Sequence, residues 1–256
     1  MKKFTAVLAL VLVLILTACV LSSCGKKEEA SAIKVYTNPE YPPFEYMEGE
    51  VATGYDIDMI KAIAEKAGFE VEIIPTQFAS VITEVLNDKN AIGVSGISIT
   101  DERKESVNFS EGYINAGLIV VQHADSGFAT IEDLKGKKIG VQLGTTSDFA
   151  AVEITGTDNT AQYNTFIDAM KDLQGNKIDA VIVDKPVGLA IMAELKDDTL
   201  VITDMGLQAD WYGIEVNKGN PDLLKKIDKA LADLKAEGFF DTLDAKYFTA
   251  DTMLAE

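Results

Sequence analysis

The segment IKAIAEKAGFEVEI (residues 60–73) changes its hydrophobic period partway along its length. Apolar residues recur at helical spacing from Ile60 to Ala67, and Gly68 follows, which is typical of a helix that ends at a glycine. From 69 to 73, apolar and acidic residues alternate, which is the pattern of a strand buried on one face. The segment therefore predicts a helix followed directly by a strand, as in α/β proteins.

The same two patterns alternate along the rest of the chain, where apolar runs predict strands and amphipathic segments predict helices. The expected strands are 33–36, 91–97, 118–122, 138–143 and 178–183, and the expected helices lie around 78–86, 165–173 and 221–237. Interleaved strands and helices predict an α/β fold with mostly parallel sheets. No repeat or break in composition marks a linker, so two lobes would be joined by short strands.

The composition excludes several classes of function. The 256 residues include 41 acidic and 23 basic side chains, a net charge of −18, whereas nucleic acids and anionic lipid heads are bound through clustered Lys and Arg. A single histidine, His123, argues against a His-rich metal site and a Ser-His-Asp triad. The sequence has neither a P-loop nor a Gly-x-Ser-x-Gly motif. We therefore expect no metal, no cofactor and no nucleic-acid partner.

The amino terminus has the features of an export signal. Lys2 and Lys3 precede an apolar run over 4–21, which could also act as an uncleaved membrane anchor. The tetrapeptides that end at Cys19 and Cys24 both resemble the bacterial lipobox, whose Cys is lipidated. We choose Cys24, which predicts a lipoprotein signal peptide over 1–23, a flexible tether over 24–32 and a folded part outside the cytoplasmic membrane.

Two segments could bind a carboxylate. Arg103 follows GVSGIS (93–98), so its guanidinium could donate two parallel hydrogen bonds while Gly96 lets a ligand approach the backbone. The alternative is an exposed arginine that balances the neighbouring acids 101 and 102. GTTS (144–147) joins a strand to a helix, and free amides at a helix start favour an anion, although a simple N-cap is the alternative.

Two further features fit other parts of a small ligand. Asp184 ends the apolar run 178–183 and could hold an ammonium group, or it could cap a helix that begins near Pro186. Tyr41 and Phe44, in the segment YPPF, could present aromatic faces to a ligand or pack in the core.

Taken in order, motifs from about 33 to 248 resemble those of the solute-binding proteins of bacterial ABC importers for polar amino acids. The motifs are YPPFE (41–45), GYDIDMI (54–60), ITDER (99–103), FS (109–110), DLKGKKIGV (133–141), GTT (144–146), IDA (178–180), Asp184 and KYF (246–248). The resemblance implies two α/β lobes joined by a two-strand hinge, with one amino acid in the cleft between them. It places lobe 1 at 33–117 plus 213–256 and lobe 2 at 118–212.

The resemblance also implies roles for individual residues. Arg103 would clamp the ligand's α-carboxylate with help from amides near Ser98 and Thr146, and Asp184 would pair with the α-ammonium. The Gly96 carbonyl would face the same ammonium. The remaining expected ligand contacts are Ser95 beside Gly96, an aromatic wall of Tyr41, Phe44 and Phe78, and Glu45 near a cationic side chain.

The identity of the amino acid follows less directly. The aromatic residues and Glu45 favour arginine or lysine through cation–π contacts, whereas Asn38 stands where some binders of basic amino acids have an Asp. A neutral ligand such as glutamine or cystine is the alternative. The resemblance implies an ABC permease and ATPase as partners, a lipid anchor as the membrane contact, and a monomer. Two other functions stay open, a detached amino-acid sensor and a cyclohexadienyl dehydratase with Glu45 as general acid.

Overall fold

The computed structural model describes residues 32–248. The predicted signal peptide, the lipidation site Cys24 and all but the last residue of the predicted tether lie outside these residues. Within 32–248, none of the helices combines the length and hydrophobicity needed to span a bilayer.

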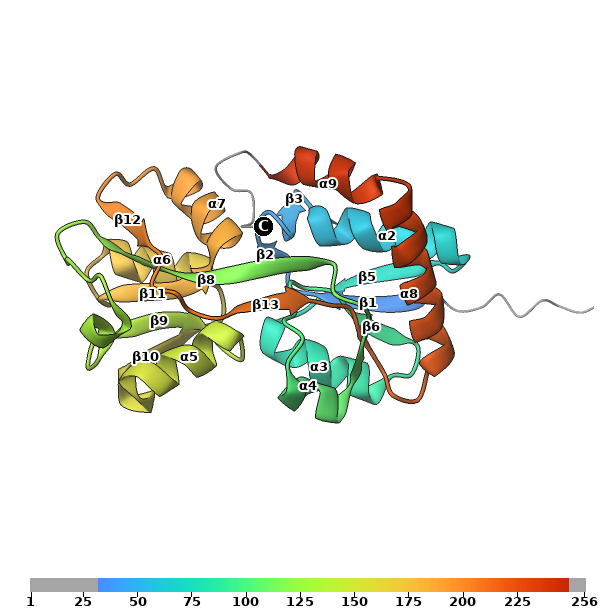
Figure 1. Ribbon diagram of the computed structural model, residues 1–256, viewed down its shortest axis with the longest axis horizontal. Helices are drawn as coiled ribbons and strands as arrows, with labels where there is room; N and C mark the ends of the chain where they lie inside the picture. Colours follow the sequence, from blue (N-terminus) through green and yellow to red (C-terminus); the bar gives the residue numbers. More distant parts are fainter. Residues whose placement is uncertain (1–31, 249–256) are drawn as a thin grey trace, which may run out of the picture. The chain divides into compact units, whose positions relative to one another are not determined.

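The first sheet has five strands in the order β5-β1-β6-β14-β7. These strands are β1 (Ile33–Thr37), β5 (Val71–Pro75), β6 (Ala91–Gly93), β7 (Asn108–Phe109) and β14 (Glu215–Val216). The helices of this part are α2 (Tyr55–Ala67), α3 (Phe78–Asn87), α4 (Asp101–Ser106), α8 (Pro221–Ala236) and α9 (Phe239–Tyr247). Helix α3 covers one face of the sheet and α2 and α8 cover the other (Figure 1). A small sheet of β2 (Glu40–Tyr41), β3 (Glu45–Glu48) and β4 (Val51–Thr53) packs on α2.

The second sheet has the order β10-β9-β11-β8-β12. Its strands are β8 (Ile114–His123), β9 (Ile139–Gln142), β10 (Thr160–Tyr163), β11 (Ala180–Asp184) and β12 (Leu200–Thr203). Helices α5 (Thr146–Thr155), α6 (Phe166–Gln174) and α7 (Lys185–Leu195) pack on its faces, and two short 3₁₀ turns, η1 (Ile131–Leu134) and η2 (Thr157–Asn159), lie beside α5. Helices on both faces of each sheet make this an α/β fold, as predicted.

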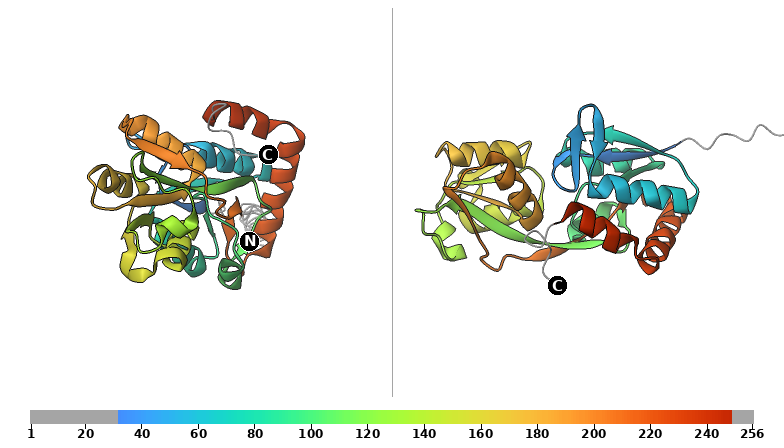
Figure 2. Two further views of the ribbon diagram at one scale, coloured as in Figure 1. Left: turned by 60° about the vertical axis from the view of Figure 1, so that its left-hand side comes forward. Right: turned by 90° about the horizontal axis from the view of Figure 1, so that it is seen from above.

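Strands β8 and β13 connect the two sheets. The first residues of β8, from Ile114 to Gly117, pair antiparallel with β13 (Ala209–Tyr212), while the rest of β8 pairs with β11 and β12. Figures 1 and 2 show this two-strand ribbon passing from one sheet to the other. The described residues nevertheless form one compact unit, so the lobe boundaries at 117 and 213 stay a prediction.

The sheets are mixed, not mostly parallel as expected. In the first sheet β1 pairs parallel with β5 and β6, but β14 pairs antiparallel with β6 and β7. In the second sheet β9 pairs parallel with β10 and β11, but β8 pairs antiparallel with β11 and β12. The antiparallel pairs involve β8, which carries the chain into the second sheet, and β14, which follows the return strand β13. Local hydrophobic patterns do not encode this direction.

The predicted helix–strand segment folds as expected, and one predicted strand is shorter. Helix α2 buries Ile57, Ile60 and Ile63 completely and ends at Gly68, whose φ of 74° provides a left-handed C-cap. Strand β6 ends at Gly93 instead of continuing to 97, because the chain turns at Gly96 with φ of 53°. Because of this turn, residues 94–98 do not continue strand β6.

Candidate functional site

Arg103 connects segments that belong to the two sheets. Its Nη1 donates to the Ser98 carbonyl at 2.8 Å and its Nη2 donates to the Gly144 carbonyl at 2.9 Å. The Thr100 hydroxyl caps α4 by accepting from the Arg103 amide at 3.2 Å, which fixes where the side chain starts. Of the two neighbouring acids, Asp101 forms its ion pair with Lys104 and not with Arg103.

The environment of Arg103 suits a buried cation. Its guanidinium carbon lies 5.5 Å from the centre of the Phe78 ring, within cation–π range. Burial lowers the pKa of Arg103, and the buried carboxylate of Glu215 opposes that shift. An arginine keeps its charge in such surroundings, so the side chain presents a fixed positive charge.

The start of α5 lies opposite this arginine. The Ser98 and Thr146 hydroxyls are 3.4 Å apart, and Thr146 is the first residue of α5. The N-cap alternative is correct for Thr145, whose hydroxyl accepts from the Asp148 amide at 3.2 Å. Ser98 and Thr146 therefore bring together two hydroxyl groups from segments that follow strands of different sheets, close to the carbonyls that Arg103 contacts.

Asp184 provides a buried negative charge at the end of β11. It accepts a short hydrogen bond from the Tyr41 hydroxyl, which also lies 3.2 Å from the hydroxyl of Tyr212. Burial raises the pKa of Asp184 to about 6, against the lowering effect of these two hydroxyls. Asp184 is the N-cap residue of α7, as the helix-cap alternative has it, but its side chain makes no capping hydrogen bond. The acid is available to pair with a cation.

The aromatic residues divide between the core and a cavity. Phe44 is fully buried and packs against the rings of Tyr41 and Tyr212 with centroids 5.8 and 5.2 Å apart, which favours the core alternative over a pocket wall. Tyr41 has its hydroxyl on Asp184. Phe78 lines a cavity beside Arg103.

The turn that follows β6 contains Ser95 and Gly96, and Glu45 lies beside it. The Ser95 hydroxyl donates to Glu45 Oε1 at 2.8 Å and accepts from the Asn38 amide at 2.9 Å. The Gly96 amide donates to Asp56 Oδ2 at 2.8 Å. Glu45 is fully buried, which disfavours its expected place near a ligand side chain.

Sequence reasoning missed several polar residues of this region. Gln142, at the end of β9, donates to Asn38 Oδ1 and to the Asn164 carbonyl, both at 2.8 Å, and so links the two sheets. Tyr212 contacts Tyr41 from the return strand. A polar residue that ends a buried apolar strand was the available signal for Gln142, as it was for Asp184.

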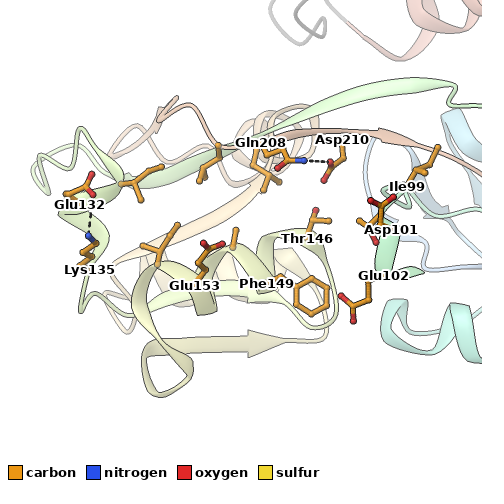
Figure 3. Close-up of a pocket in the computed structure, with 16 residues that line it drawn as sticks. Ile99, Asp101, Glu102, Glu132, Lys135, Thr146, Phe149, Glu153, Gln208 and Asp210 are labelled. Atoms are coloured by element: carbon orange, nitrogen blue, oxygen red, sulfur yellow. Dashed lines mark hydrogen bonds and ion pairs between the residues drawn. The ribbon is translucent and has the colours of Figure 1, made fainter. Parts of the chain in front are cut away.

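Two cavities adjoin these residues. The smaller, of about 380 Å³, is lined by Phe78, Arg103, Leu143 and Gly144 among others, and its size is typical of small-molecule sites. The larger, of about 840 Å³, is shown in Figure 3, where Thr146 and Phe149 of α5 lie opposite Asp101 and Glu102 of α4. The acidic side chains of the larger cavity, Asp101, Glu102, Glu132, Glu153 and Asp210, outnumber its one cation, Lys135. This charge disfavours a carboxylate in the larger cavity.

Comparisons with known proteins cover nearly the whole described chain. The family model of the bacterial extracellular solute-binding proteins, family 3, matches residues 33–250. The arginine-binding extracellular protein ArtP of Bacillus subtilis (strain 168) is 32% identical over 255 residues, which cover 98% of this chain and 100% of ArtP.

Solved structures agree in fold. The arginine-, lysine-, histidine-binding protein ArtJ from Geobacillus stearothermophilus has a TM-score of 0.81 and 30% identity, over 85% of this chain and 95% of ArtJ. The ancestral amino acid-binding protein AncCDT-1, a precursor of cyclohexadienyl dehydratase, has a TM-score of 0.77 and 33% identity, over 85% of this chain and 96% of that one.

Proposed function

Because this chain belongs to the bacterial extracellular solute-binding proteins of family 3, we propose that it binds one free polar amino acid for an ABC importer. The observation that carries the proposal is the pair of opposite charges at Arg103 and Asp184. An amino acid loses the hydration of two charges when it is buried, so its site must match both of them. Arg103 and Asp184 are suited to this task.

We assign the α-carboxylate to Arg103. A guanidinium carries five N–H donors, so Arg103 can retain the Ser98 and Gly144 carbonyls and still donate to a carboxylate. Backbone amides near Ser98 and Thr146 add further donors in this assignment. Because Arg103 already contacts segments of both sheets, a ligand held there would strengthen the link between them.

We assign the α-ammonium to Asp184 and the Gly96 carbonyl. Asp184 accepts from the Tyr41 hydroxyl, and an ammonium group would add a full positive charge beside the acid. Ser95 belongs to the same segment as Gly96 and supports it through its hydrogen bonds to Asn38 and Glu45.

For the side chain, we propose arginine or lysine, with glutamine or cystine as the alternative. Phe78 already holds one guanidinium, that of Arg103, at 5.5 Å, and its ring is suited to cationic groups. The names of ArtP and ArtJ also point to basic amino acids. A neutral ligand is favoured by Asn38, because its side-chain Oδ1 accepts from Gln142 and supplies no negative charge.

A binding role fits the site better than the dehydratase alternative. That reaction needs a general acid that reaches the substrate, and Glu45 was the candidate. Glu45 is fully buried and its Oε1 accepts from Ser95, so it is poorly placed to protonate a ligand. AncCDT-1, which shares the fold, is itself described as an amino acid-binding protein. Absence of prephenate turnover by the purified protein would support the binding role.

We further propose that the protein acts outside the cytoplasmic membrane as a monomer, anchored through lipid on Cys24. Its partners would be the permease and ATPase subunits of an importer, to which it delivers the amino acid. A sensor role would use the same site and a different partner. Co-purification of the full chain with a permease, or with a membrane kinase, distinguishes these two roles.

A thermal-shift screen of the standard amino acids and cystine tests the proposed function. A ligand at 100 times its dissociation constant adds about 2.7 kcal/mol of stability, which raises the midpoint by about 5–10 °C for a domain of this size. We expect this shift with arginine or lysine. A shift with glutamine or cystine alone would refute the cationic assignment, and no shift with any amino acid would refute the binding function.

A further inference from the structure

Two fully buried carboxyl groups, Glu45 of β3 and Asp56 of α2, lie together under the turn that follows β6. Each accepts a hydrogen bond from that turn, Glu45 from the Ser95 hydroxyl and Asp56 from the Gly96 amide, both at 2.8 Å. The backbone holds them side by side, because the Asp56 amide donates to the carbonyl of Phe44, the residue before Glu45, at 2.9 Å. Their remaining oxygens, Glu45 Oε2 and Asp56 Oδ1, are buried and have no hydrogen-bond partner within residues 32–248.

In the described part of the chain, neither acid takes part in a salt bridge. The titratable groups that act on the pair are the phenols of Tyr113, Tyr55 and Tyr41, and burial raises the pKa of each of them, so they stay neutral. Two adjacent carboxylates without a cation repel each other strongly in a buried site.

The proton is better placed on Glu45 than on Asp56. Asp56 Oδ2 accepts two hydrogen bonds, from the Gly96 amide and the Tyr113 hydroxyl, both at 2.8 Å, and such donors stabilise a carboxylate. Glu45 accepts only from Ser95. Burial and the nearby charge of Asp56 raise the pKa of Glu45 well above its usual range, whereas burial raises that of Asp56 to about 6.

The pair also joins the candidate site to the strands that connect the sheets. Tyr113 precedes β8, and its amide donates to the Tyr212 carbonyl of β13 at 3.0 Å. The same Asp56 oxygen therefore holds both the Gly96 segment and the beginning of the connecting ribbon. Gly96 in turn lies so close to Tyr41 that a Cβ atom at this position would be 2.7 Å from the Tyr41 ring.

We propose that Glu45 and Asp56 share one proton, and that this pair positions Ser95 and Gly96 for binding of the amino acid. Glu45 donates the proton to Asp56, and the ionised Asp56 holds the Gly96 amide and Tyr113. Neither acid touches the ligand. The positioning role rests on the proposed function, whereas the shared proton is a property of the fold itself.

Loss of the proton gives the sign of the pH dependence. Because the pKa of each acid is raised in the folded state, their contribution to stability is complete below their unfolded values and is lost as pH rises through the folded ones. In alkaline solution the pair carries two negative charges, which separates the acids and displaces Gly96. Ligand affinity should then fall as well.

The experiment compares Glu45→Gln and Glu45→Ala with the wild type. A glutamine amide can donate permanently to Asp56 while its oxygen still accepts from Ser95, so it replaces the protonated acid. The infrared difference spectrum between the wild type and Glu45→Gln should show the loss of the carbonyl band of one buried, protonated carboxylic acid, whether or not another buried acid such as Glu215 is also protonated. Glu48→Gln, which changes an exposed acid of the same strand, is the control and should retain the band.

Isothermal titration with L-arginine, and with L-glutamine in parallel, tests the positioning role. Glu45→Ala should weaken binding about tenfold or more, and Glu45→Gln should restore most of that loss. As the pH is raised until the infrared band of the pair is lost, the ratio of the wild-type affinity to the Glu45→Gln affinity should fall by about threefold or more. If Glu45→Ala does not fold, the pH dependence of the ratio of wild-type to Glu45→Gln affinity and the infrared band still test the proposal.

Three results would overturn the proposal. They are retention of the protonated-acid band in Glu45→Gln, an affinity ratio that is constant with pH, and equal loss of binding in the glutamine and alanine variants. Failure of the proposed function is distinguishable, because the wild type would then bind no amino acid at any pH while the infrared band would still report the shared proton.

Discussion

Replacing Arg103 by alanine should abolish most amino-acid binding. The side chain makes charge-assisted hydrogen bonds of 2.8 and 2.9 Å to carbonyls of Ser98 and Gly144, which belong to segments of different sheets. Removing it leaves the ligand carboxylate without a positive partner, and the loss of one partner of a buried charge pair costs about 2–5 kcal/mol. Affinity should therefore fall by roughly 30- to 4,000-fold.

Isothermal titration calorimetry of purified variants measures this effect. Arg103→Lys should also weaken binding, because an ammonium cannot reproduce the two-pronged geometry of a guanidinium. Lys104→Ala is the control, since Lys104 is the next residue of α4 and makes only an exposed contact to Asp101 at 3.1 Å, of a kind that contributes about 0–1 kcal/mol. A folded Arg103→Ala protein with affinity within about threefold of the wild type would refute the assignment of the carboxylate to Arg103.

Three more predictions concern Asp184, Gly96 and Cys24. Asp184→Asn should weaken binding by about 2–5 kcal/mol in calorimetry. When the pH is lowered through about 6, Asp184 becomes protonated and the affinity of the wild type should fall. The same loss of affinity at low pH in Asp184→Asn would contradict this. Gly96→Ala should lower the free energy of unfolding in urea by about 1–3 kcal/mol more than Gly127→Ala. Both glycines have positive φ, 53° and 69°, but a Cβ atom at Gly96 would lie 2.7 Å from the Tyr41 ring, whereas a Cβ atom at Gly127 would meet nothing within 4 Å. An equal loss of unfolding free energy in the two variants would argue against this contact. Cys24→Ser should move the protein from the membrane fraction to the soluble fraction or leave an uncleaved precursor; Cys19→Ser should do so only if Cys19 is the lipidated residue.

Local patterns predicted most elements of the fold. Strand β1, helix α2 and helix α3 begin and end within a few residues of expectation, except that α2 starts at Tyr55, before the first apolar residue used to predict it. The strand expected at 91–97 is shorter for a local reason, the positive φ of Gly96. Hydrophobic period could not reveal this, because Gly96 lies among apolar and small residues that suit a buried strand.

The candidate site was only partly predictable. Arg103 and Asp184 could be singled out because charged residues next to buried apolar strands are unusual. The burial of Phe44 and Glu45 could not be predicted, since an aromatic ring or an acid in a turn-rich segment has the same sequence signature in a pocket as in the core. Their complete burial depends on neighbours such as Tyr212 and Ser95, which come from distant parts of the chain.

The sequence by itself determined the α/β class, the order of strands and helices, and the motifs that identify the family, because each depends on residues close together in the chain. Tertiary structure alone decided the strand directions and the contacts that cross the molecule. The Tyr41–Asp184 hydrogen bond joins residues 143 positions apart, and Gln142 reaches Asn38 across 104 positions. Such contacts, like the meeting of Glu45 and Asp56, depend on which strands become neighbours and on burial that excludes water, and neither is written in a local hydrophobic period.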